Sequence, residues 1–317
     1  MNEVPIGVVG AGVLGSHHLR KCLINPRVRL SGFYDADPAR REAAARQLGV
    51  KAYPDMDALL AETAAIIIAT PCSTHHGIAR QCLDLGKHLL IEKPLAASYG
   101  EGEDLVMRAH KNGTVLHVGH SEAFNAAFIK LASLHPVPRF IEVHRLAQFS
   151  PRGTDVPVVL DLMVHDLQLI MRLCGEEPLY DRIAATGVPV VSADIDIANV
   201  RLTFPSGCVA NLTASRISIK RMRKIRIFAP GEYFSVDLDK STIDRGSLLK
   251  EIDPATGLPI SFARDTITPA DALEAELQAF IDAIEGRSRN RGVDGREALI
   301  VLRAADVILA KLASGTV

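Results

Sequence analysis

Residues 6–15 read IGVVGAGVLG, and this stretch decides the fold of the amino-terminal part of the chain. An apolar, strand-like run leads directly into a G-x-G-x-x-G motif, and helix-forming residues follow it. In such a motif the first glycine permits a tight turn, the second lets the backbone approach a pyrophosphate, and the third lets helix and strand pack closely. The helix start adds N–H groups and positive potential for phosphate oxygens. The residues predicted to hold a dinucleotide here are Gly10, Gly12, Val13, Leu14 and Gly15.

An acidic residue stands where a dinucleotide-binding motif requires one. Asp35 lies 20 residues beyond Gly15, at the end of the next strand-like run, where a carboxylate can bind the adenosine ribose hydroxyls. An aspartate at this place also repels a 2′-phosphate, which favours NAD as the cofactor. Arg40 and Arg41 follow closely and keep NADP open as the alternative.

The first 120 residues alternate short apolar runs with helical segments. The runs are apolar throughout, as expected when helices cover both faces of a parallel sheet. Such alternation predicts a doubly wound α/β Rossmann domain over residues 1–121. The expected strands are 5–9, 28–34, 65–69, 88–91 and 115–118; the expected helices are 37–48, 74–85 and 98–110, with Gly49, Gly86 and Gly113 just beyond their ends.

The pattern changes after residue 121 and predicts a second domain over 122–317, with an open, largely antiparallel sheet and helices. Alternating residues Val200, Leu202 and Phe204 predict a strand with one buried face. The final helices are placed in this domain, with packing against the first domain as an alternative. The expected elements are a long buried helix over 155–173 stopped by Gly175, hairpins 197–204/208–217 and 225–228/233–238, a helix opened by Thr268-Pro269, and a last helix over 296–313.

Composition narrows the class of protein. The 36 Lys+Arg against 37 Asp+Glu leave a formal net charge of −1, without the basic excess that nucleic-acid binding requires. No apolar run approaches the roughly 20 residues of a membrane span, and we expect no signal peptide before the first strand. Five scattered cysteines fit reduced thiols, so we expect a cytoplasmic protein. The 11 histidines contain no H-E-x-x-H motif, so no metal is expected.

A lysine follows the fourth expected strand in the sequence Ile91-Glu92-Lys93-Pro94. Open α/β sheets bind ligands at the carboxyl ends of their strands, so Lys93 can touch both cofactor and substrate. Pro94 disfavours helical backbone at Lys93 and so restricts its approach. A solvated loop lysine is the alternative.

The helix expected over 155–173 carries a narrow polar stripe at Asp161, His165, Gln168 and Arg172. Asp161 and His165 lie one helical turn apart and share a face. Histidine with aspartate suits proton transfer near neutral pH, whereas the solvent side of an amphipathic helix is the alternative.

Positive charge is concentrated over residues 220–226, KRMRKIR. Arg221 is the candidate here for binding an anionic substrate such as a nucleotide diphosphate. A solvated strand face is the alternative.

Together these features resemble the glucose–fructose oxidoreductase/myo-inositol dehydrogenase (Gfo/Idh/MocA) family over nearly the whole chain. The resemblance rests on the glycine motif, Asp35, ATPCSTHH at 69–76, IEKP at 91–94, VGHSEAFN at 118–125, and the D-x-x-x-H of Asp161 and His165. The stretches VVLDLMVHDLQLI and GCVANLTASRIS are most similar to bacterial UDP-N-acetylglucosamine 3-dehydrogenases, which are associated with making the diamino sugar of some lipid A molecules.

The resemblance implies a Rossmann domain, an active site between the domains, and an open sheet that forms a homodimer or homotetramer. It implies that Lys93, Asp161 and His165 are the catalytic, substrate-contacting set. It further implies cofactor contacts by Thr70, Pro71, His75, Glu92, Lys93 and His120. Family members often read G-H-x-x-R-F-N-P where this chain has Ala123 in place of the arginine, so a substrate contact by that side chain is absent here.

The expected function is NAD-dependent oxidation of a sugar hydroxyl to a ketone, at C3 of UDP-N-acetylglucosamine. Asp161 would orient His165, and either His165 or Lys93 would take the hydroxyl proton. Oxidation of a free polyol or sugar such as inositol is one alternative. A non-catalytic, NAD-sensing regulatory protein on the same fold is another.

Overall fold

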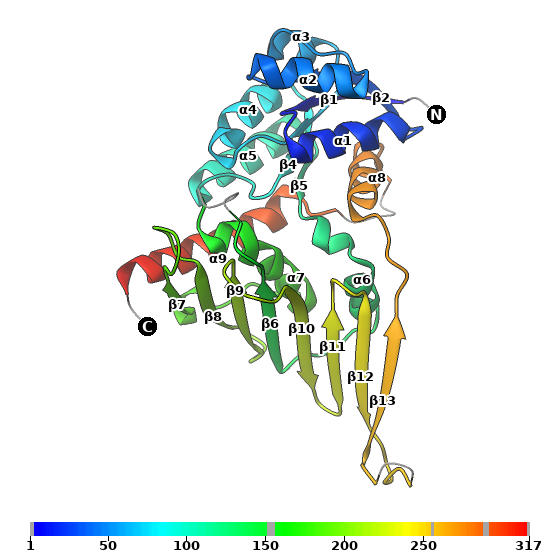
Figure 1. Cartoon of the computed structure of the whole chain (residues 1–317), viewed down its shortest axis with the longest axis vertical. Helices are drawn as coiled ribbons and strands as arrows, with labels where there is room; N and C mark the ends of the chain where they lie inside the picture. The colour runs from blue at the N-terminus through cyan, green and yellow to red at the C-terminus, as the bar shows by residue number, and fades with distance from the viewer. Residues whose placement is uncertain (1–2, 151–155, 255–256, 288–291, 316–317) are drawn as a thin grey trace. The chain divides into compact units, whose positions relative to one another are not determined.

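A computed structural model describes residues 3–150, 156–254, 257–287 and 292–315 (Figure 1). The chain divides into two compact units, each with its own sheet. The first unit comprises residues 1–121 and 272–302, and the second comprises 122–271 and 303–317. Among the described residues, no helix has the length and apolar character needed to cross a membrane.

The first unit contains a five-stranded sheet in the order β2-β1-β3-β4-β5, and its strand pairs are all parallel. This is the doubly wound α/β sheet that the sequence predicts. Residues Ala65–Ile68 of β3 are all buried, as expected for a strand covered on both faces. The strands are β1 Val4–Val9, β2 Val28–Tyr34, β3 Ala65–Ile68, β4 His88–Glu92 and β5 Leu116–Gly119.

Local turn chemistry explains where the helices of this unit begin and end. Asp37 accepts hydrogen bonds from two backbone N–H groups at the start of α2, and Ser98 caps α5. Gly49, Gly86 and Gly113 have φ of 65°, 69° and 64°, the left-handed backbone that ends a helix. The helices are α1 Val13–Ile24, α2 Pro38–Leu48, α3 Met56–Ala61, α4 Cys72–Asp84, α5 Tyr99–Asn112 and α8 Ala272–Ile284.

The second unit contains an eight-stranded sheet, seen in Figure 1 as one row, in the order β13-β12-β11-β10-β6-β9-β8-β7. Only the pair β6–β9 is parallel among its described strands, so the expected, largely antiparallel sheet is confirmed. Val200, Leu202 and Phe204 are buried as predicted. The strands are β6 Phe140–Leu146, β7 Ala184–Val188, β8 Ile197–Thr203, β9 Val209–Ser215, β10 Met222–Ala229, β11 Glu232–Asp237, β12 Thr242–Leu248 and β13 Ile260–Thr266.

The second unit also contains short helical elements. They are the 3-10 turns η1 Ser121–Phe124 and η3 Tyr180–Arg182, helix α6 Ala126–Ser133, the π-helix η2 Val159–Met163, and helix α7 Val164–Cys174. Helix α9, Gly295–Ser314, begins among residues assigned to the first unit and ends among those of the second.

Two predicted helix starts are wrong. The helix expected from residue 155 begins only at η2, because Pro157 precedes it and disfavours helical backbone before itself; residue 155 lies outside the described residues. Gly175, with φ of 68°, does end α7 as predicted. Thr268-Pro269 does not open a helix, since α8 starts at Ala272, directly after Asp271, a residue type favoured at the N-cap.

Candidate active site

The glycine motif forms the turn between β1 and α1, and its three glycines are constrained in different ways. A Cβ on Gly10, whose φ is 96°, would lie 2.4 Å from the Ala69 carbonyl oxygen. One on Gly15 would lie 1.9 Å from the Gly10 oxygen, so both positions require glycine. A Cβ on Gly12 would meet nothing within 4 Å. The turn therefore leaves open space at the one glycine that a pyrophosphate must approach.

The start of α1 fits a phosphate group. Gly12 is the N-cap and provides no side-chain hydrogen bond to the first turn. The next side chains, Val13 and Leu14, are 66% and 49% exposed. A helix N-terminus with this exposed, uncapped first turn supplies backbone N–H groups and positive potential to an anion.

Asp35, directly after β2, is buried and joins the glycine turn to the end of that strand. Its Oδ2 accepts a hydrogen bond of 2.7 Å from the Ala11 N–H, and its Oδ1 accepts one of 2.9 Å from the Asp37 N–H. A carboxylate has about four acceptor sites, so capacity for a ribose hydroxyl remains. Arg40, half exposed, lies 3.5 Å from Oδ2, and Arg41 donates to the Asp35 carbonyl oxygen.

His75 connects two loops that carry predicted cofactor residues. Its Nε2 lies 2.9 Å from the Thr70 carbonyl oxygen, and its Nδ1 lies 2.9 Å from the Pro94 carbonyl oxygen. Burial lowers the pKa of His75, although the carbonyl contacts oppose this effect. Pro71, which directly follows Thr70, is the N-cap of α4. The ring therefore ties the loop after β3 to the loop after β4.

Lys93 follows β4 and is half-buried between two buried neighbours, Glu92 and Pro94. This environment does not fit a fully solvated loop lysine. Glu92 lies 2.7 Å from His18 Nε2 on α1. His120 follows β5, is buried, and donates its N–H to the Val118 carbonyl oxygen.

The predicted cofactor residues of the first unit thus come together at one edge of one sheet. The glycine turn follows β1, Asp35 follows β2, Thr70 lies in the loop after β3, Glu92 ends β4 with Lys93 next, and His120 follows β5. This carboxyl edge is where open α/β sheets bind their ligands. A dinucleotide fits the residues present.

In the second unit, Asp161 and His165 lie on either side of a change in helix geometry. Asp161 belongs to the π-helix η2, and His165 lies in the first turn of α7. Short π-helical segments occur frequently at functional sites. Both side chains are half-buried, and Gln168, one turn further on, is fully buried. The polar stripe is therefore not the solvent side of an amphipathic helix.

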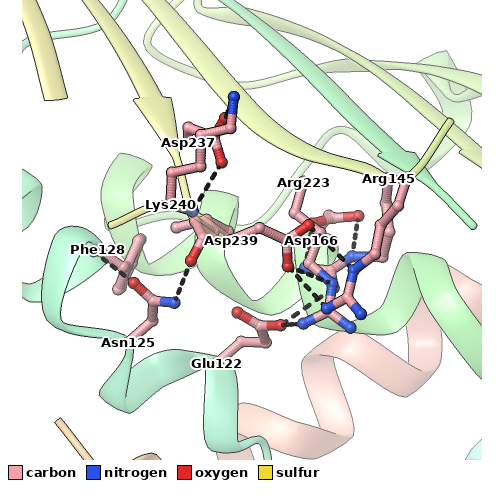
Figure 2. Close-up of polar contacts among 11 residues, drawn as sticks. Glu122, Asn125, Phe128, Arg145, Asp166, Arg223, Asp237, Asp239 and Lys240 are labelled. Carbon is pink, nitrogen blue, oxygen red and sulfur yellow. Dashed lines mark hydrogen bonds and ion pairs between the residues drawn. The ribbon is translucent and has the colours of Figure 1, made fainter. Parts of the chain in front are cut away.

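A buried network of charges that the sequence analysis did not identify holds α7 against the sheet (Figure 2). Arg145 on β6 donates to both carboxylate oxygens of Asp166, at 2.9 and 2.8 Å. The same guanidinium donates to Glu122 at 3.2 Å, and Arg223 donates to that oxygen at 2.6 Å. Burial opposes the charge of Arg145, but these carboxylates outweigh it and raise its pKa. The network fixes the residue next to His165.

The sequence does contain a signal for this network. In β6, Ile141 and Val143 face inward, and Arg145 continues their alternation. An arginine in a core-facing register requires a buried acid, and Asp166 lies in the mainly apolar helix α7. No local sequence pattern, however, predicts that Arg145 and Asp166 contact each other.

The arginines of the basic run already have acidic partners. Arg221 is bound to Asp239 by two hydrogen bonds of 3.1 and 2.8 Å, and its side chain is 61% exposed. Arg226 pairs with Glu142 at 3.2 Å. To bind a substrate anion, Arg221 would have to share its guanidinium with Asp239, so its role stays a prediction.

The glycine turn, the acidic residue after β2 and the lysine after β4 define the first unit as the cofactor-binding part of a dinucleotide-dependent oxidoreductase. A family model described as "Oxidoreductase family, NAD-binding Rossmann fold" matches residues 4–120. The chain is 36% identical over 307 residues to the UDP-N-acetylglucosamine 3-dehydrogenase of Acidithiobacillus ferrooxidans, covering 94% of this chain and 95% of the relative. It therefore belongs to the Gfo/Idh/MocA family of oxidoreductases, as its motifs predict.

Two further comparisons describe the extent of the similarity. A solved structure of the Acidithiobacillus enzyme matches with a TM-score of 0.91 and 35% identity, over 99% of both chains. The scyllo-inositol 2-dehydrogenase (NAD(+)) of Bacillus subtilis is 26% identical, over 68% of this chain and 68% of that protein. This protein is an NAD(P)-dependent oxidoreductase acting on CH–OH groups.

Proposed function

We propose that this protein is an NAD-dependent dehydrogenase that oxidises the C3 hydroxyl of UDP-N-acetylglucosamine to a ketone, in the synthesis of cell-envelope sugars. The observation that carries this proposal is the extent of the similarity to the Acidithiobacillus enzyme. It runs through both units, including the α7 region and the large sheet, and is not confined to the Rossmann unit. The inositol dehydrogenase, by contrast, matches about two thirds of the chain.

The residues at the carboxyl edge of the first sheet would hold the cofactor. The glycine turn and the start of α1 would bind the pyrophosphate, and Asp35 would accept hydrogen bonds from the adenosine ribose. NAD, when bound, accepts a hydride from the carbon that is oxidised. The aspartate favours NAD, and Arg40 beside it makes a direct comparison of NAD with NADP a necessary part of the test.

Three residues would take part in proton transfer from the hydroxyl group. His165 would take the hydroxyl proton, and Asp161 would hold the imidazole in a productive orientation. Lys93 would donate a hydrogen bond to the same oxygen and stabilise its developing negative charge. The roles of Lys93 and His165 can be exchanged, because both types of side chain serve as base or as hydrogen-bond donor.

The test is a single turnover with NAD and UDP-N-acetylglucosamine deuterated at C3, followed by mass spectrometry of the NADH. We expect deuterium in the NADH, and no deuterium from substrate labelled at C4. Label from the C4 substrate would contradict the position of oxidation. Absence of label with NAD bound, together with NADH formation from inositol, would favour a polyol dehydrogenase. A protein that binds NAD and oxidises neither class would favour the sensing function.

Variants of the proposed proton-transfer residues test the mechanism. Lys93→Ala and His165→Ala should each lower kcat by about 10²–10⁴-fold, with NAD affinity largely kept, since the pyrophosphate and the adenosine ribose would be bound by the glycine turn and Asp35. Lys111→Ala and His110→Ala, at exposed positions in the last turn of α5, are matched controls. Near-normal kcat in either active-site variant would remove that residue from the mechanism.

A further inference from the structure

Three titratable side chains from three elements meet inside the first unit, directly before Lys93. They are His18 from α1, Glu92 from the end of β4, and Glu276 from α8. All three are buried, and Glu276 is 2% exposed. One ligand atom from each lies within 4.8 Å of the others. Of the three, only Glu92 has a predicted role, as a cofactor contact.

The surroundings of this cluster are apolar and tightly packed. Leu277, Phe280 and Ile281, neighbours of Glu276 on α8, belong to the hydrophobic core of the unit. On the other side, a Cβ on Gly119 would lie 2.9 Å from Glu92 Oε2, so the β5 backbone presses against the carboxylate. A carboxylate in such a place has few waters to stabilise its charge.

The two carboxyl groups are bonded very differently. Glu92 Oε1 lies 2.7 Å from His18 Nε2, so the imidazole stabilises a charge on Glu92. Both carboxyl oxygens of Glu276 are buried without a hydrogen-bond partner among the described residues. Burial raises the pKa of Glu276 well above its ordinary value, and the charge of Glu92 raises it further. Two carboxylates this close in an apolar site do not both ionise, and the proton belongs on Glu276.

We propose that Glu276 is a positioning residue: a buried, uncharged carboxylic acid that, with His18, confines negative charge to Glu92 and so fixes the end of β4 from which Lys93 projects. The effect on catalysis that this inference implies rests on the role proposed for Lys93. His75 holds the Pro94 carbonyl oxygen on the other side of the lysine. The residues before and after Lys93 are thereby held by separate side chains.

A divalent cation bound by the same three side chains is the competing explanation. Metal-binding carboxylates are deprotonated, so a cation requires both glutamates to be charged. Our proposal requires one of them to be protonated. The protonation state of Glu276 therefore separates the two, and it can be observed without any assay of activity.

The decisive experiment is a difference infrared spectrum of the purified full-length protein against Glu276→Gln at pH 7. We expect the wild-type protein to show the carbonyl stretch of a protonated carboxylic acid that the variant lacks. Glu274→Gln is the matched control, because Glu274 lies on the same helix and accepts a hydrogen bond from Asn25, and this change should leave the band in place. Absence of the band, or one equivalent of divalent metal in elemental analysis, would overturn the proposal.

A second measurement tests positioning. Glu276→Leu should lower kcat for sugar oxidation by about 10-fold or more, with little change in KM for NAD, because displacement of a reacting group has costs of this order. Glu276→Gln, neutral and of the same shape, should restore most of that loss. Equal losses in both variants would overturn the positioning role. If the wild-type protein oxidises no sugar, the proposed function fails, whereas the infrared band still decides the protonation of Glu276.

Discussion

Each unit of this protein buries a cluster of charged groups beside a predicted catalytic residue, and the two clusters balance charge in opposite ways. In the first unit, two glutamates and one imidazole adjoin Lys93. In the second, Arg145 and Arg223 face Asp166 and Glu122 next to His165 (Figure 2). Guanidinium groups keep their charge in a protein, so the acids facing them can remain ionised. Where a second acid faces the first, one of them must hold a proton.

The comparison teaches that burial alone does not determine the state of a carboxyl group. Asp166 and Glu276 are equally inaccessible, at 2% exposure each. Asp166 receives two hydrogen bonds from one guanidinium, whereas neither oxygen of Glu276 has a hydrogen-bond partner in the part of the chain that the structure describes. Burial raises the pKa of both acids, but the Arg145 guanidinium opposes this rise for Asp166, whereas the charge of Glu92 adds to it for Glu276. Opposite consequences of neutralising each acid are therefore expected.

The largest expected effect comes from removing the shared cation of the second cluster. Arg145→Leu leaves the Asp166 carboxylate buried without its guanidinium and removes one of two arginines from Glu122. We expect the free energy of unfolding to fall by about 3–5 kcal/mol, measured by urea denaturation. Arg226→Leu is the control, because Arg226 pairs with Glu142 on the same strands in a partly exposed setting, and its loss should stay below about 1 kcal/mol. Similar losses in both would contradict a special role for the buried network.

Neutralising one acid in each cluster tests the comparison directly. Asp166→Asn should lower the free energy of unfolding by about 1.5–3 kcal/mol, because a hydrogen-bonded carboxylate facing Arg145 is replaced by an uncharged group. Glu276→Gln at pH 7 should cause no loss, because the native side chain is already uncharged there. Parallel urea denaturation of both variants measures the two values. A destabilised Glu276→Gln beside an unaffected Asp166→Asn would reverse the assignment of charges.

The pH dependence of stability should differ between wild type and Glu276→Gln. Unfolding exposes Glu276 to water, where it ionises at its ordinary, lower pKa, so above that pKa the folded protein holds one more proton than the unfolded chain. Stability from this group then falls as pH rises, by at most about 1.4 kcal/mol per pH unit, until the raised folded pKa is passed.

The groups facing Glu276 are His18 from α1 and Glu92 from β4, while Glu274 and Asp282 on its own helix bond Asn25 and Arg27. Glu276→Gln lacks this proton linkage, so its stability relative to wild type should increase with pH from 5 to 8. Thermal unfolding of both proteins in matched buffers gives this difference. A difference that stays flat with pH would indicate an ionised Glu276.

Local rules predict the first unit well because its cofactor site is built from short segments. The strand 28–34 is found with the bounds expected, and Gly15 is required by its contact with the carbonyl oxygen of Gly10, which is close to it in the sequence. The sheet order itself follows from βα alternation, since each strand pairs with a near neighbour in sequence. Even so, the binding roles of these residues stay predictions until a ligand is measured.

Long-range pairing explains what the sequence did not reveal. Glu276 lies on a helix whose pattern reads as amphipathic, and no local rule brings it to Glu92. Arg145 on β6 and Asp166 on α7 come from different elements and meet only in the tertiary structure, where the guanidinium donates to the carboxylate. The available signal in the sequence is a charged residue at a position where the pattern predicts an apolar one. This signal indicates that the residue is buried with a partner, but it does not identify the partner.

The smallest expected effect concerns the exposed end of the second cluster. Arg221 pairs with Asp239 largely in solvent, so Arg221→Ala should change the free energy of unfolding by less than about 1 kcal/mol. If its guanidinium also contacts a substrate diphosphate, KM for UDP-N-acetylglucosamine should rise about fivefold, while KM for NAD stays constant. Lys240→Ala, which removes an exposed cation near Asp237, is the matched control. The KM for the nucleotide sugar could instead be equal in wild type, Arg221→Ala and Lys240→Ala. Arg221 would then be only part of a surface ion pair, and the half-buried groups near His165 would have to recognise the substrate.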